Sequence, residues 1–240
     1  MELDSELAVT LPRPLRQRAL HMAEPVTGIV LAGGRSRRMG GRDKAWIELS
    51  GRSLLRWVLD ALETVTDGQV LVARDAVQRE RLEGLGLPVV VDRFEARGPL
   101  TGIQAGLDAS PTDLALVVAC DMPLVRPALL ELLLAAIGPL HAAVPYIGEG
   151  EPPSRLVGAT ARDAGLQPLL AAYRRSCLPP LERLLRGGPL PTTALISVLK
   201  ARVVAPDAWR EADPDGRSFL NVNTAEDLVQ AAQRLNGPDA

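Results

Sequence analysis

The chain has 240 residues and a mass of 25.6 kDa, which allows one large α/β domain or two small ones, and 47% of its residues are apolar. Its 27 Lys and Arg nearly balance 29 Asp and Glu, which argues against a dedicated nucleic-acid-binding protein. Two cysteines and two separated histidines exclude a disulfide framework and a Cys/His zinc cluster, and no apolar run reaches the ~20 residues of a membrane span. These features predict a cytoplasmic protein.

Residues 1–24 differ from the rest of the chain. They contain prolines and basic residues but lack the continuous apolar region of a secretory signal. Met22 begins a second plausible start, shortly before the first apolar run. We therefore expect residues 1–24 to be a disordered N-terminal extension or the product of an upstream start, and residues 25–240 to form a single domain.

From Thr27 onward, strand and helix patterns alternate. Strands are expected at 28–32, 69–73, 88–91, 114–119 and 142–144, where short apolar runs occur. Helical apolar spacing covers 54–62 and 127–137. After Pro145 the pattern is less regular, with helical pieces expected at 167–173 and 178–185, a β-like segment at 194–204 and a last helix at 224–235. The alternation predicts a mostly parallel sheet with helices on both faces.

The loop after the first expected strand is rich in glycine and positive charge. It holds four glycines, which let backbone N–H groups approach an anion, together with Arg35, Arg37, Arg38, Arg42 and Lys44. The P-loop pattern does not match, because Lys44 follows an aspartate and precedes an alanine, and the dinucleotide glycine pattern also fails. The loop suits a triphosphate, and the alternative is a solvated basic turn.

The third expected strand is followed by Asp92 and then by Gly98, Gly102 and Gly106. Glycines that recur every four residues leave one smooth face on a helix, which a base or ribose can approach. The alternative is that the stripe only permits tight packing of the helix on the sheet.

The fourth and most apolar expected strand is followed by Cys120 and Asp121. A carboxylate in that place can hold Mg²⁺, which takes one or two carboxylates with phosphate oxygens and water, or it can cap the next helix. We interpret Cys120 as a small buried hydrophobe and not as a nucleophile, because no histidine is near it in the sequence. Acyl-transfer chemistry has no support, since a Gly-x-Ser-x-Gly elbow is absent.

Near the end of the chain, Asn221 and Asn223 alternate with apolar residues before Thr224, which begins a capping pattern. From an extended segment both amides point the same way. They either face a ligand together or serve only the start of the helix.

Taken together, four segments resemble the molybdenum cofactor guanylyltransferases over about residues 27–235. They are Leu31-Ala-Gly-Gly with its later Asp43-Lys44, Gly98-Pro-Leu, Cys120-Asp-Met-Pro and Asn221-Val-Asn-Thr224. The segment at 166–179 resembles the guanylyl branch, and the Gly-His-Pro segment of the related cytidylyltransferases is absent there. The resemblance implies a Rossmann-like three-layer α/β fold with a mostly parallel central sheet and a small irregular β/α extension for the acceptor.

The resemblance also implies an activity and a set of residues. The reaction is Mg²⁺-dependent transfer of GMP from GTP to the terminal phosphate of molybdopterin, which releases pyrophosphate. Catalytic roles fall on Lys44, Asp121 and Arg38, with Asp121 as the metal ligand. Nucleotide or substrate contacts are expected at Leu31, Ala32, Gly33, Gly34, Lys44, Asp92, Gly98, Asp121, Asn221 and Asn223. Arg74 departs from the family pattern, which often has an asparagine there.

Other readings stay open at this point. The same fold serves cytidylyltransferases for this cofactor and sugar-phosphate nucleotidyltransferases, and a non-catalytic nucleotide-binding or cofactor-delivery protein is a further alternative. We expect the acceptor to lie along the irregular region 145–191, where Arg155, Gln167 and Arg174 are candidate contacts. GTP and molybdopterin are the expected partners, with transient contact to molybdoenzymes or cofactor chaperones and none to nucleic acid or membrane.

Overall fold

The computed structural model describes residues 24–33, 35–36, 42–91, 98–149, 165–188 and 190–236. The expectation for the N-terminal extension concerns residues that lie outside these ranges, apart from Glu24, and it stays a prediction. The carboxylate of Glu24 is bound by the guanidinium group of Arg174, at 2.5 and 2.9 Å. None of the described helices has the length and the apolar character that a membrane span requires.

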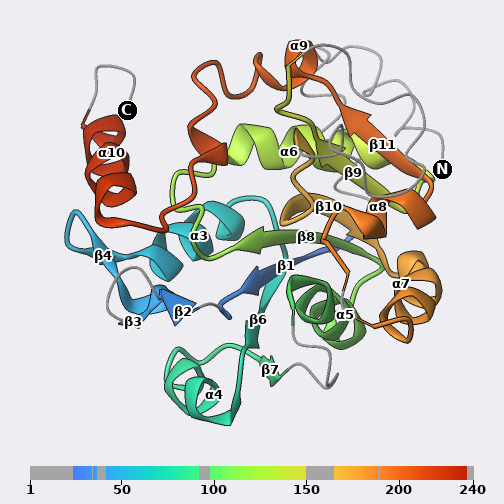
Figure 1. The fold of residues 1–240 in the computed structure, drawn as a ribbon, viewed down its shortest axis with the longest axis horizontal. Helices are drawn as coiled ribbons and strands as arrows, with labels where there is room; N and C mark the ends of the chain where they lie inside the picture. The colour runs from blue at the N-terminus through green and yellow to red at the C-terminus, as the bar shows by residue number, and fades with distance from the viewer. Residues whose placement is uncertain are drawn as a thin grey trace, which may run out of the picture.

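A seven-stranded sheet forms the centre of the fold, in the order β11-β9-β10-β8-β1-β6-β7 (Figure 1). Neighbouring strands pair in parallel except where β10 pairs with β8 and β9, so β10 alone runs against the others. The strands are β1 (Val26–Leu31), β6 (Gly68–Ala73), β7 (Val89–Val91), β8 (Leu114–Ala119), β9 (Ala142–Pro145), β10 (Leu170–Arg174) and β11 (Ala201–Val204). The expected mostly parallel sheet is confirmed.

Helices cover both faces of this sheet, because its central strands are apolar on both sides. Every residue of β1 and β8 is buried, and Val30 packs in one core cluster whereas Ile29 packs in the other. One cluster contains residues of α3 (Leu54–Glu63), α4 (Ala76–Glu83) and α6 (Pro127–Ile137). The other contains residues of α5 (Pro99–Ala109), α7 (Leu178–Leu185) and α8 (Ala194–Val198). The three-layer fold is therefore confirmed.

Two segments adopt a different structure from the one that their sequence suggests. The segment 167–173 was expected to be helical, but it contains β10, whose residues Leu170–Tyr173 are buried between β8 and β9. Leu and Ala favour a helix, so the pairing of this segment with the edges of β8 and β9 overrides its local preference. The β-like segment 194–204 forms the helix α8 before β11. The sequence patterns do not predict the polar helix α4.

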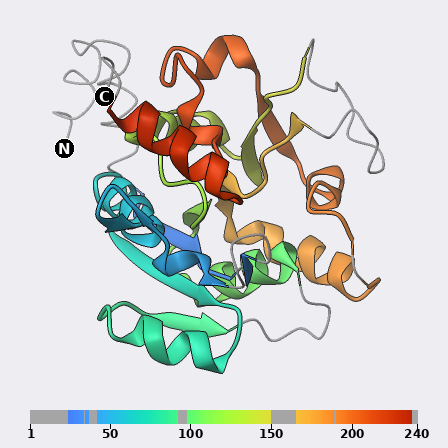
Figure 2. The same ribbon diagram turned by 60° about the vertical axis from the view of Figure 1, so that its left-hand side comes forward.

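Small elements gather at the edge of the sheet where the parallel strands end. Figure 1 shows the arrowheads of β1 and β8 pointing to the side occupied by β2, β3, β4 and α10. These elements are β2 (Arg35–Ser36), β3 (Arg42–Asp43), the 3₁₀ turn η2 (Lys44–Trp46), β4 (Glu48–Leu49), β5 (Arg52–Ser53) and α10 (Ala225–Leu235). A small core of Ile47, Leu49, Leu124, Val222 and Ala231 joins the β4–β5 hairpin to α10. Figure 2 shows α10 passing close to this hairpin.

Candidate functional site

Lys44, Asp121 and Asn223 converge at the carboxyl edge of the sheet. The Nζ atom of Lys44 lies 2.7 Å from Oδ2 of Asp121 and 2.5 Å from Oδ1 of Asn223. Lys44 begins η2, Asp121 follows β8, and Asn223 precedes α10, so three distant segments meet at one ammonium group. The side chains of Lys44 and Asp121 are 11% and 19% exposed, so their charges are only partly screened by water.

The end of β1 lies directly beside this charge pair. The N–H of Cys120 donates to the carbonyl of Leu31 at 3.1 Å, and the N–H of Ala32 donates to Val72 at 3.0 Å. The side chains of Leu31 and Ala32 are buried, so these residues offer a ligand mainly their backbone. Gly33 is exposed, and a Cβ there would lie 3.4 Å from Cβ of Arg74. The structure therefore places the carbonyl groups of Leu31 and Ala32 against Cys120, the residue before Asp121.

Three predicted site residues, Gly34, Arg38 and Asp92, lie outside the described residues. Their roles stay predictions. Arg74 follows β6 at the same edge, and its Nε forms an ion pair with Asp75 at 2.8 Å. An arginine therefore stands beside Gly33.

The glycine stripe of α5 serves helix packing along most of its length. A Cβ on Gly106 would lie 2.4 Å from Cγ2 of Ile29, and one on Gly102 would lie 3.3 Å from Cδ2 of Leu31. These two glycines thus let α5 approach β1, and the interpretation of the whole stripe as a ligand face is wrong. Gly98 is different, because it caps the helix in extended backbone and a Cβ there would meet nothing within 4 Å. It lies one turn before Gly102, towards the carboxyl edge.

The two asparagines have different partners. Asn223 contacts Lys44, whereas Nδ2 of Asn221 donates to the carbonyl of Phe219 at 3.2 Å. The N–H of the intervening Val222 donates to the carbonyl of Asp121 at 2.8 Å. This backbone bond fixes the asparagine segment against the loop that carries Asp121.

Asp227 holds Asn223 from the first turn of α10. Its Oδ2 accepts hydrogen bonds from the N–H groups of Asn223 and Thr224 at 2.8 and 2.9 Å, and Thr224 Oγ1 accepts from the N–H of Asp227 at 3.2 Å. The bond from Asn223 is the main reason why the pKa of Asp227 is lowered. The sequence identifies the capping box but not this further bond to Asn223.

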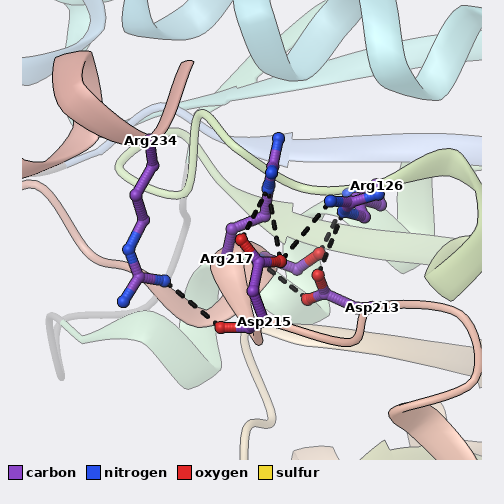
Figure 3. Close-up of polar contacts among 6 residues, drawn as sticks. Arg126, Asp213, Asp215, Arg217 and Arg234 are labelled. Atoms are coloured by element: carbon purple, nitrogen blue, oxygen red, sulfur yellow. Dashed lines mark hydrogen bonds and ion pairs between the residues drawn. The ribbon is translucent and has the colours of Figure 1, made fainter. Parts of the chain in front are cut away.

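Arg126, Asp213, Asp215 and Arg217 form a charge cluster, and Arg234 of α10 reaches the carbonyl of Asp215 (Figure 3). Asp213 is fully buried and lies 3.1 Å from Nε of Arg126, an ion pair that is not aligned as a hydrogen bond. Ser218 joins the two residues, because its N–H donates to Asp213 and its Oγ accepts from the N–H of Arg126, both at 2.9 Å. Burial raises the pKa of Asp213. The cluster ties the start of α6, just after Asp121, to the residues before Asn221.

Cys120 is buried beside the site, and its thiol is unreactive. Its Sγ lies 3.7 Å from the carbonyl of Ala32, and burial raises the pKa of its thiol far above the ordinary value, with a further contribution from the Asp121 carboxylate. Since the thiolate is the reactive form, Cys120 is a poor nucleophile. Burial also raises the pKa of Cys177 to about 12.

The three candidate acceptor contacts have separate outcomes. Gln167 lies at the carboxyl edge, where its N–H donates to the carbonyl of Pro145 at the end of β9. Arg174 pairs in register with Leu114 at the amino end of β8, so it lies at the opposite edge of the sheet. The prediction that Arg174 contacts the acceptor is therefore wrong. Its guanidinium group is already engaged by Glu24 and Asp113. Arg155 lies outside the described residues.

The described residues contain no group of three or more His, Cys, Asp or Glu side chains arranged to hold a metal ion. Mg²⁺ in nucleotide sites needs fewer protein ligands, because phosphate oxygens and water complete its shell. The Asp121 carboxylate is a hard oxygen donor and the amide oxygen of Asn223 lies close by, so the donor chemistry at this edge fits Mg²⁺.

Comparison with known proteins gives a consistent result. The sequence model of the MobA-like NTP transferase domain matches residues 28–202. A molybdenum cofactor guanylyltransferase of Desulfosudis oleivorans is 36% identical over 211 residues, which cover 87% of this chain and 95% of that protein.

Solved structures are similar as well. The molybdopterin-guanine dinucleotide biosynthesis protein A of Archaeoglobus fulgidus has a TM-score of 0.71 and 28% identity, over 87% of this chain and 98% of that one. The 4-diphosphocytidyl-2C-methyl-D-erythritol synthase of Anaerococcus prevotii has a TM-score of 0.63 and 18% identity, over 89% and 99%. The second likeness concerns the fold alone.

Proposed function

The chain belongs to the MobA-like NTP transferase family, as its motifs predict, and from this premise we propose that it transfers GMP from GTP to the terminal phosphate of molybdopterin. The products are molybdopterin guanine dinucleotide and pyrophosphate. The observation that carries the proposal is the meeting of Lys44, Asp121 and Asn223 beside the backbone of Leu31 to Gly33. A cation, a hard carboxylate and an exposed glycine backbone on one sheet edge are the groups that a nucleoside triphosphate requires.

The chemistry needs little covalent help from the protein. An oxygen of the acceptor phosphate attacks the α-phosphorus of GTP, the bond from that phosphorus to the β-phosphate oxygen breaks, and pyrophosphate leaves with the electron pair. The attacking group is already an anion, so no general base has to create it. The barrier lies in bringing two anions together and in stabilising the charge that develops on pyrophosphate.

Lys44 supplies fixed positive charge for this step, and the N–H groups of the first loop supply oriented dipoles. Asp92, which the family resemblance assigns to the nucleotide, and Arg38, a predicted source of positive charge, complete the proposed contacts. Asn223 is neutral, so it orients Lys44 and can hydrogen-bond a phosphate without adding negative charge. Gln167, at the same edge, is a candidate contact for the acceptor.

Mg²⁺ is the proposed metal cofactor, and Asp121 is its proposed protein ligand. When bound there, the ion would neutralise phosphate charge and orient the triphosphate. Cytoplasmic location and transient contact with molybdoenzymes or cofactor chaperones stay predictions.

A turnover assay with purified protein tests the proposal. Pyrophosphate release is measured with molybdopterin and Mg²⁺, in parallel for GTP, CTP and ATP, and again with EDTA. The proposal predicts release that depends on GTP, on the acceptor and on the metal. Preference for CTP would favour the cytidylyltransferase alternative, and acceptor-independent binding without any release would favour a delivery protein.

A further inference from the structure

Gln78 is a buried polar residue on α4, a helix whose remaining surface is largely polar. It is 1% exposed and, with Leu82, forms the buried side of the helix. Burying a carboxamide is unfavourable unless its donors and acceptor are satisfied, so its partners matter.

The carboxamide of Gln78 connects three segments at the carboxyl edge of the sheet. Its Nε2 donates to the carbonyl of Ala32 at 2.9 Å and to Oδ1 of Asp43 at 2.7 Å. Its Oε1 accepts from the backbone N–H of Arg74 at 2.7 Å. One side chain therefore joins the end of β1, the end of β6 and the residue before Lys44.

The bond to Ala32 has a consequence for Gly33. The peptide that joins these residues is planar and trans, so its C=O and N–H point in opposite directions. By holding the Ala32 carbonyl towards α4, Gln78 directs the Gly33 N–H away from α4. Gly33 is an exposed residue that follows the end of β1, where the Leu31 carbonyl accepts from the N–H of Cys120, the residue before Asp121.

The bond to Asp43 has a consequence for Lys44. Oδ1 of Asp43 also accepts from the N–H of Ala45 at 3.4 Å, which caps the 3₁₀ turn η2. Lys44 is the first residue of that turn. Gln78 thereby holds the turn from which the Lys44 ammonium group reaches Asp121 and Asn223.

We propose that Gln78 is a positioning residue for the triphosphate, because it fixes both the Gly33 N–H and the backbone that carries Lys44. This inference rests on the proposed function and adds a residue to it. An amide is required at this position, since a carboxylate would place oxygens against the Ala32 carbonyl and the Asp43 carboxylate. A methionine would fill the space but make no hydrogen bond.

Gln69 offers a matched control. It lies on β6, the strand that precedes α4, and its Nε2 likewise donates to a backbone carbonyl, that of Leu59 at 2.8 Å. Gln69 pairs in register with Gly28, near the amino end of β1, so it is remote from the candidate site. Its substitution removes the same type of bond at the other end of the strand.

The test compares Q78E and Q78M with Q69E and Q69M in unfolding temperature, in equilibrium binding of GTP, and in KM for GTP and for molybdopterin. We expect both Gln78 variants to raise the GTP KM and Kd about tenfold or more, while the molybdopterin KM stays within about twofold. The Gln69 variants should lower the unfolding temperature without changing either KM.

Equal GTP affinity in the Gln78 and Gln69 variants would overturn the inference, and so would a molybdopterin KM that rises as much as that for GTP. If neither Gln78 variant folds, D43A takes their place, because it cuts the link to η2 and leaves Gln78 intact. An unchanged GTP affinity in D43A would then contradict the inference. A wild-type protein that binds GTP but transfers no GMP would contradict the proposed function, while the GTP-binding comparison still decides the role of Gln78.

Discussion

The Nζ atom of Lys44 lies 2.7 Å from Oδ2 of Asp121, a residue 77 positions later in the chain. The chain has two lysines, and the other, Lys200, is exposed just before β11, at the amino end of that strand. Lys200, at the opposite edge of the sheet, is therefore a control for substitutions of Lys44.

Loss of either member of this charge pair should abolish most of the activity. We expect K44A and D121A each to lower GMP transfer by ~10²–10³-fold, because each removes a preorganised charge from the phosphate site. Pyrophosphate release at saturating GTP and Mg²⁺ measures the effect, and circular dichroism checks the fold. K200A should retain wild-type turnover. Near-normal transfer by K44A or D121A would contradict the assigned roles.

Chemical labelling should distinguish the two lysines without any turnover. With limiting acetic anhydride, we expect GTP and Mg²⁺ to lower acetylation of Lys44 at least about fivefold, because a phosphate group bound there shields the amine. Acetylation of Lys200 should not change. Peptide mass spectrometry measures acetylation at both lysines in one sample. Equal protection of the two lysines would contradict binding of GTP at Lys44.

The two asparagines should differ in their effect on rate. N223A removes one of the two hydrogen-bond partners of Lys44, and we expect GMP transfer to fall about tenfold or more. N221A removes a hydrogen bond within its own segment and should cost less than about threefold. Steady-state kinetics on both variants measures this difference. Losses of the same size would mean that both amides face the substrates.

Asp227 should make stability depend on pH in the acidic range. Its folded-state pKa is lowered from 3.8, mainly by the hydrogen bond from Asn223, so its stabilising contribution is complete above about pH 5 and is lost as the pH falls through the lowered pKa. D227N lacks this contribution. We therefore expect the wild-type unfolding temperature to exceed that of D227N above about pH 5, with the difference shrinking towards about pH 3. A difference that grows on acidification would refute this sign.

Substitution by alanine should destabilise the protein at Gly106 but not at Gly98. G106A forces a methyl group to 2.4 Å from Cγ2 of Ile29, so we expect a loss of about 1–3 kcal/mol in the free energy of unfolding. G98A meets open space and should leave that free energy nearly unchanged. Urea denaturation of both variants measures the two values. A stable G106A would show that α5 can move away from the sheet.

The central layers could be read from the sequence because burial on both faces leaves a plain signal. β1 and β8 are continuous apolar runs, and strand ends in a parallel sheet share an edge, so the meeting of Lys44 with Asp121 followed from their places after two such strands. β10 could not be read in this way, since Leu170 to Tyr173 suit a helix equally well until they are placed between two strands.

The supporting residues of the site were hidden for a different reason. Gln78 lies in a helix without an apolar stripe, and its three bonded partners are 4, 35 and 46 positions away. Arg126 and Asp213 are 87 residues apart and meet only after the chain folds. Side-chain hydrogen bonds of this kind carry no periodicity, so the sequence gives no pattern from which to predict them.

The most direct measurement follows the fate of two labelled phosphates of GTP. With purified protein, molybdopterin and Mg²⁺, α-labelled GTP should give labelled molybdopterin guanine dinucleotide, and γ-labelled GTP should give labelled pyrophosphate in equal amount, with both products formed ~10²–10³-fold more slowly by D121A. An α-label that never enters an acceptor-dependent product, or that appears there equally from D121A, would contradict guanylyl transfer at this site.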